Sequence, residues 1–142
     1  MEDDNKVIKG SDPDIEKLLR SLKFIWDIYL QSSKEIKDDI LKTILTEFAE
    51  KKELQMVEIM KTFQVEHVEY NRKSGSAIPS SSVKFERRGD RLRNCISLEK
   101  ELLKLYDETL AKKIEEVQKF ILNNHKQDNI RQVQKFESFL TA

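Results

Sequence analysis

Two ionisable residues lie on predicted helix faces that are otherwise apolar, and they are the residues of this chain best placed to do chemistry. They are Glu99 and His125. A carboxylate that is buried alone costs too much free energy, so a buried Glu99 must be neutralised, paired or bound to a metal. Asp27 and Glu50 are further candidates for a carboxylate site built around Glu99. The apolar neighbours at helical spacing are Ile96, Leu103 and Tyr106 for Glu99, and Leu122, Val133 and Phe136 for His125.

The histidine spacing does not fit a di-iron centre. Such a centre takes Glu-X-X-His from two helices, because positions i and i+3 project together into a bundle core. Gln64 stands three residues before His67, and Leu122 stands three residues before His125. We therefore assign no metal and no cofactor, and we favour a simpler interpretation. In it Glu99 bonds a tyrosine hydroxyl or a basic side chain, and His125 is a satisfied or half-exposed polar group.

No catalytic residue is assigned. The single cysteine, Cys95, has no histidine close to it in the sequence and is expected to be a small packing residue. No glycine-rich phosphate loop, nucleophile elbow or paired-cysteine zinc motif is present. The arginine-rich stretch at 84–93 is expected to be a solvated helix entry. The sequence therefore favours a protein that is not an enzyme.

Composition limits the class of partner. Basic and acidic residues both total 26, so no net charge attracts the chain to nucleic acid or to an anionic membrane. No apolar run approaches the roughly 18 residues of a membrane-spanning helix, and the N-terminus lacks the pattern of a signal peptide. We expect a cytoplasmic protein, whose partners are further copies of itself or other helical proteins.

These residues must be positioned by helices, because three glycines, two prolines and 37% charged residues are typical of an all-α fold. Residues 1–11 are expected to be a disordered tail, and 12–142 to form a single four-helix bundle domain. The first helix follows Asp12 as N-cap and runs to about Lys34. The second starts after Asp38 and ends between residues 64 and 70.

The segment 71–90 separates the second helix from the third. It contains Gly75, Pro79 and five serines between residues 74 and 82, which disfavours a helix. About twenty extended residues reach roughly 66 Å, more than the roughly 40 Å of a 27-residue helix. We predict a long crossover, which lets the third helix run parallel to the second as in ferritin-like bundles. The alternative is an exposed loop that joins two independent hairpins.

The start of the fourth helix is open. Apolar periodicity continues from the third helix through Ile114, Val117 and Ile121, which slightly favours a break at 123–129. A break at 111–113 would instead give four helices of comparable length, with the last one running from about Glu115 to Leu140.

Three stretches carry a family resemblance: "IWDIYLQSSKEI" at 25–36, "EFAEKKELQMVEIM" at 47–60 and "LRNCISLEKELLKLYDETL" at 92–110. With them, residues 14–140 resemble uncharacterised bacterial proteins of the ferritin-like superfamily. The resemblance implies four helices with the last break near residues 111–114, and we follow it there. The chain departs from the family in its shorter connection after the second helix. A basic residue that is typical of the second helix in the family appears here only as Lys52. We predict a structural or protein-interaction module, with a degenerate iron or manganese site around Glu99 as the alternative.

Overall fold

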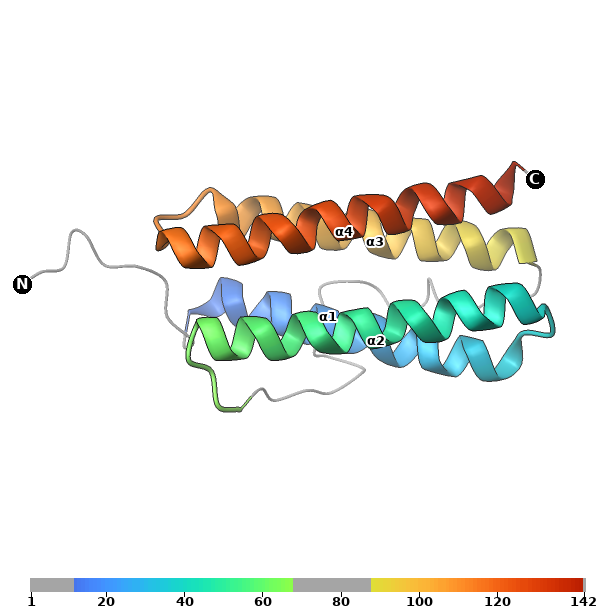
Figure 1. Ribbon diagram of the computed structural model, residues 1–142, viewed down its shortest axis with the longest axis horizontal. Helices are drawn as coiled ribbons and strands as arrows, with labels where there is room; N and C mark the ends of the chain where they lie inside the picture. The colour runs from blue at the N-terminus through green and yellow to red at the C-terminus, as the bar shows by residue number, and fades with distance from the viewer. Residues whose placement is uncertain (1–11, 68–87, 142) are drawn as a thin grey trace, which may run out of the picture.

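The computed structural model describes residues 12–67 and 88–141. These residues form four helices, α1 (Pro13–Glu35), α2 (Asp39–Thr62), α3 (Arg88–Leu110) and α4 (Glu116–Leu140), and the described part contains no strand (Figure 1). The prediction of an all-α four-helix protein is confirmed. The predicted tail at 1–11 and the centre of the predicted crossover at 68–87 lie outside the described residues.

Local capping explains where the helices begin. The Asp12 side chain accepts the backbone N–H of Asp14 at 2.8 Å, and Asp38 accepts N–H groups in the first turn of α2. The backbone N–H of Glu115 donates to Gln118 Oε1 at 2.9 Å, which is half of a capping box at the start of α4. Each of these bonds satisfies a donor that has no partner within its helix. Both N-caps predicted from the sequence are confirmed.

The boundary between α3 and α4 follows the family resemblance rather than the apolar periodicity. α4 begins at Glu116, so the break preferred from periodicity, at 123–129, is wrong. Ile114, which lies in the connection between α3 and α4, is buried, whereas Val117 is 58% exposed. The two residues continue the stripe of α3 in the sequence but do not belong to that helix, because α3 ends at Leu110, Ile114 lies in the connection, and Val117 lies in the first turn of α4.

Ion pairs between helix ends establish the directions of the helices. Arg91 near the start of α3 lies 3.8 Å from Glu35 at the end of α1. Lys112, just after α3, lies 2.7 Å from Asp14 at the start of α1. α1 and α3 are therefore antiparallel, and since α2 returns along α1, α2 and α3 run in the same direction (Figure 1). This is the direction that the predicted crossover requires.

The buried positions of the two hairpins repeat with a constant shift. Lys52 and Asn129 are 77 residues apart, and the same shift relates Tyr29 to Tyr106 and the first residues of α2 and α4. The contacts of these residues are related in the same way. Lys52 bonds Gln132. The equivalents of these two residues, Asn129 and Gln55, also bond each other. The bundle therefore has approximate internal two-fold symmetry. Further equivalent buried pairs are Leu22 and Glu99, Ile25 and Leu102, Leu45 and Leu122, Phe48 and His125, and Ile59 and Phe136.

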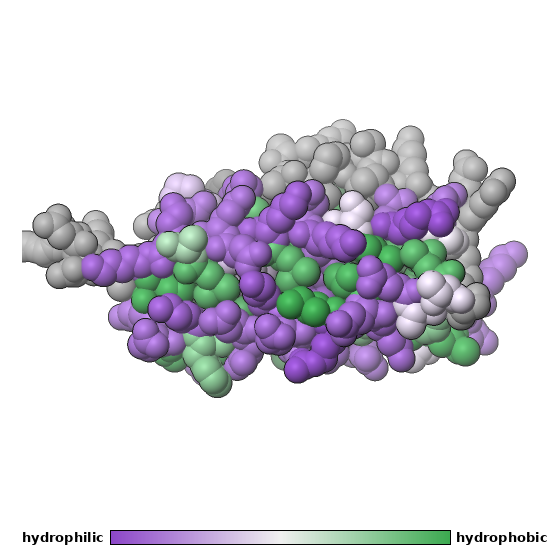
Figure 2. Space-filling view, turned by 90° about the horizontal axis from the view of Figure 1, so that it is seen from above, coloured by the Kyte–Doolittle hydropathy of each residue, from purple (hydrophilic) through white to green (hydrophobic). Residues whose placement is uncertain are grey.

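The outer surface is mainly hydrophilic on the α3–α4 side, where smaller apolar areas lie between the polar side chains (Figure 2). No helix in the described ranges has both the length and the apolar character that crossing a lipid bilayer requires.

Candidate functional site: a buried polar network

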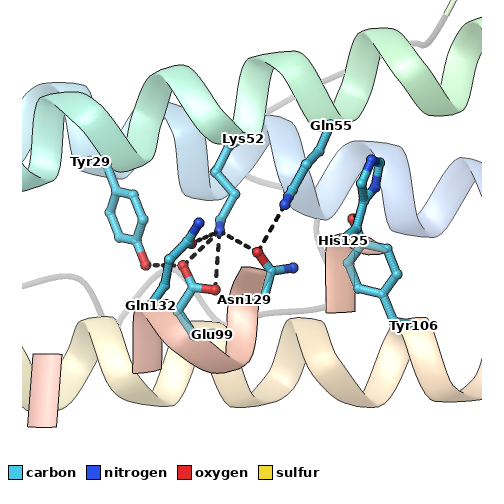
Figure 3. A network of polar contacts seen from close by, with 8 residues as sticks. All are labelled: Tyr29, Lys52, Gln55, Glu99, Tyr106, His125, Asn129 and Gln132. Atoms are coloured by element: carbon cyan, nitrogen blue, oxygen red, sulfur yellow. Dashed lines mark hydrogen bonds and ion pairs between the residues drawn. The ribbon is translucent and has the colours of Figure 1, made fainter. Parts of the chain in front are cut away.

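A buried ion pair lies at the centre of the bundle. Lys52 on α2 and Glu99 on α3 are both fully buried. The Lys52 Nζ lies 2.8 Å from Glu99 Oε2 and 3.1 Å from Oε1 (Figure 3). Each charge thus has the other as compensation for the water that it lost on folding.

α4 completes the environment of the Lys52 amine. Nζ donates to Asn129 Oδ1 at 3.1 Å and also to Gln132 Oε1. Four oxygens therefore surround this nitrogen, which matches the three donors of an ammonium better than the two of a neutral amine. Burial lowers the pKa of Lys52, and the Glu99 carboxylate opposes that shift. The geometry supports a charged lysine held by its neighbours.

Tyr29 on α1 brings the first helix into the same cluster. Its hydroxyl donates to Glu99 Oε2 at 2.6 Å. Burial raises the pKa of Tyr29, and the adjacent carboxylate raises it further, so the phenol keeps its proton. Glu99 therefore bonds both a tyrosine hydroxyl and a basic side chain. The sequence predicted one or the other of these two partners.

A second cluster lies around His125 on α4, which is only 3% exposed. Its Nε2 lies 2.6 Å from Glu58 Oε1, and its Nδ1 lies 3.1 Å from the Tyr106 hydroxyl. Because a carboxylate only accepts hydrogen bonds, we place the proton of the neutral ring on Nε2. Nδ1 then accepts the Tyr106 proton, and the pKa of Tyr106 is raised chiefly by burial. His125 is a satisfied polar group, as predicted.

His125 should make stability depend on pH. Burial lowers the pKa of His125, and Glu58 only partly opposes the shift. The folded protein therefore takes up this proton less readily than the unfolded chain, whose histidines titrate near about 6.5. The contribution of the neutral, buried His125 to stability is fully present above about pH 6.5. It is lost as the pH falls from about 6.5 to the pKa of His125 in the folded protein.

The measurement is the urea midpoint of wild type and of His125→Gln at about pH 7.5 and about pH 5.5. We expect the urea midpoint to change less between the two pH values in the variant than in wild type. His67 is present in both proteins and so does not contribute to the difference between them. A variant whose midpoint falls as steeply as that of wild type would contradict this assignment.

Gln55 on α2 extends the cluster around Lys52 through Asn129. Its Nε2 donates to Asn129 Oδ1 at 3.0 Å (Figure 3). Gln55 Oε1 and Gln132 Nε2 are buried and bond no other described residue. The network therefore contains buried polar atoms that reduce its net contribution to stability.

The residues around Glu99 do not fit a metal site. The Glu99 oxygens face an ammonium and a phenol, where a metal would need further carboxylates or imidazoles. Of the predicted contributors, Glu50 is exposed and Asp27 is only half-buried, and His125 bonds Glu58. In the described part of the chain, no three His, Cys, Asp or Glu side chains lie close enough together to hold one ion.

Cys95 matches its simpler interpretation, whereas the predicted solvated helix entry fits Arg93, whose side chain is exposed, but not Arg91, whose side chain is only 12% exposed. Cys95 is buried, and burial raises the pKa of its thiol, which makes it a packing residue. Arg93 lies 2.7 Å from Asp90, and Arg91 contacts Glu35, so these arginines lie beside acidic side chains. Residues 84–87 lie outside the described part.

Comparison of the chain with protein-family models, with curated proteins and with solved structures finds no match. Its function is therefore argued from its own residues.

Sequence reasoning did not identify most of this network. Lys52 entered only through the family resemblance, and the partners Gln55, Glu58 and Gln132 were not singled out. A signal was present, since Lys52 and Gln55 interrupt the apolar stripe of α2 at its own spacing. Which residue of another helix would meet them depends on the packing of the helices, which periodicity does not specify.

Proposed function

We propose that the chain is an intracellular, ferritin-like helical bundle that acts as a protein-interaction module rather than as an enzyme. Two observations support this proposal. The ionisable side chains of the two buried clusters bond one another, and so neither cluster presents a free ionisable group to a substrate. The parallel directions of α2 and α3 are those of a bundle with one long crossover.

A groove between α1 and α2 is the observation that carries the interaction role. It has a volume of about 330 Å³ and a wall of Leu19, Met56, Val57 and Met60. Methionine side chains adapt to apolar surfaces of different shape, as at binding surfaces that accept helices. Charged and polar side chains of Lys23, Glu53, Glu66 and His67 also line the groove.

The equivalent seam between α3 and α4 is different. Lys100 is the equivalent of Lys23, and its Nζ lies 3.9 Å from Glu137, which stands in the place of Met60. Lys23 instead lies over the Trp26 ring, 4.4 Å from its centroid. The Lys100–Glu137 ion pair spans the α3–α4 seam, whereas one wall of the α1–α2 groove is apolar.

Site-specific photocrosslinking tests this function. We expect a benzophenone amino acid in place of Val57 to crosslink a protein in the cell several-fold more than one in place of Gln134, its exposed equivalent on α4. Equal crosslinking at both positions, or none at either, would contradict the proposed function.

A further inference from the structure

A self-complementary stripe lies on the outer face of α2. Glu50, Leu54, Val57 and Lys61 follow one another at spacings of four, three and four residues, which places them on one face of the helix. All four are exposed, with Leu54 at 64% and Val57 at 56%. We call these four residues the α2 stripe.

The internal symmetry shows that the apolar centre is specific to α2. The equivalent positions of Leu54 and Val57 on α4 are Arg131 and Gln134, both polar and exposed. Arg131 pairs with Asp128 at 2.8 Å. Two hairpins with the same buried register therefore have different outer surfaces, and the exposed leucine and valine are not a requirement of the fold.

The charges of the α2 stripe match a second copy of itself in the antiparallel orientation. Leu54 and Val57 are equally far from the midpoint between residues 55 and 56, and so are Glu50 and Lys61. Two such helices crossing at this point bring Leu54 of each copy against Val57 of the other. They also bring each Glu50 against a Lys61 of opposite charge. A parallel arrangement would instead oppose like charges.

We propose that two copies of this chain associate through the α2 stripe in a two-fold, antiparallel arrangement. The proposal names the partner of the interaction surface proposed above and rests on that function. Val57 belongs both to the stripe and to the apolar wall of the groove. Leu54 of a second copy, which contacts Val57 in this arrangement, therefore lies beside that groove. The contact is small, and we expect a weak dimer that forms as the concentration rises.

Sedimentation equilibrium of the full chain over a concentration series is the measurement. We expect reversible association with a two-copy limit, and at least a tenfold weaker association constant for Leu54→Glu. The matched control is Arg131→Glu at the equivalent position on α4, which should leave the association constant unchanged. Both sites are exposed, and the helical circular dichroism signal checks that each variant is folded.

Charge reversal tests the geometry. Glu50→Lys and Lys61→Glu should each weaken association, and the double variant should restore it, because both intermolecular pairs are then reversed together. A wild-type chain that stays monomeric at every concentration, or a dimer unaffected by Leu54→Glu, would overturn the proposal. Crosslinking at Val57 to a different protein, with a monomeric purified chain, would overturn the second copy while leaving the interaction module intact.

Discussion

We expect Lys52→Met to lower the free energy of unfolding by about 3–5 kcal/mol, the largest effect of any substitution considered for this protein. The reason lies in what the substitution leaves behind. Glu99 is fully buried, and its strongest compensation is the Lys52 ammonium at 2.8 Å. Without that ammonium a carboxylate stays in the core, and among the described residues only the Tyr29 hydroxyl donates to it. Urea unfolding at neutral pH measures the loss.

The double variant Lys52→Met, Glu99→Gln separates the loss of a charge partner from the loss of packing. It removes both charges while keeping the shape of residue 99, so we expect it to be more stable than Lys52→Met alone by about 1–3 kcal/mol. Lys104→Met at the exposed Lys104–Glu101 pair is the control and should change stability by less than about 0.5 kcal/mol. Purely additive losses in the double variant would show that the two charges do not depend on each other.

The two equivalent tyrosines give the second large effect. Tyr29→Phe removes a donor to a charged carboxylate at 2.6 Å, and we expect a loss of about 1.5–3 kcal/mol. Tyr106→Phe removes a bond of 3.1 Å to the neutral His125 ring, which should cost about 0.5–1.5 kcal/mol. Both side chains are fully buried, and they occupy equivalent positions in the two hairpins.

The pair is its own control, because each variant loses one hydroxyl from a buried ring of the same size. Thermal or urea unfolding of the two variants at one pH gives the comparison. Losses of equal size would mean that the charge on Glu99 adds nothing to the Tyr29 hydrogen bond.

The buried ion pair also selects how the hairpins pair. Under the internal symmetry, Leu22 on α1 is the equivalent of Glu99, and Asn129 is the equivalent of Lys52. If two α1–α2 hairpins packed together in place of α1–α2 with α3–α4, each Lys52 would meet Leu22 and a second Lys52 and would lose its carboxylate. Such a pairing would bury uncompensated positive charges, which is costly. The Lys52–Glu99 ion pair therefore favours packing of the α1–α2 hairpin against the α3–α4 hairpin over packing against a second α1–α2 hairpin.

Local features of the sequence account for the helices. Asp12 and Asp38 cap the first two helices because side-chain oxygens reach backbone donors only two or three residues away, a geometry that is independent of the rest of the fold. The apolar stripes likewise identified core residues such as Leu45 and Phe136. The periodicity of Val117 was misleading, because the same spacing arises when a turn separates two helices.

The sequence by itself determined an all-α chain, the N-caps of its first two helices, and two of its buried polar residues, Glu99 and His125. Only the tertiary structure decided that Lys52 is the counter-charge of Glu99 and that Glu58 meets His125. Those partners are 47 and 67 residues apart in the chain. The periodicity of one helix specifies which face is buried, but the residue opposite depends on the relative shift of two helices, which is fixed by packing over their whole length.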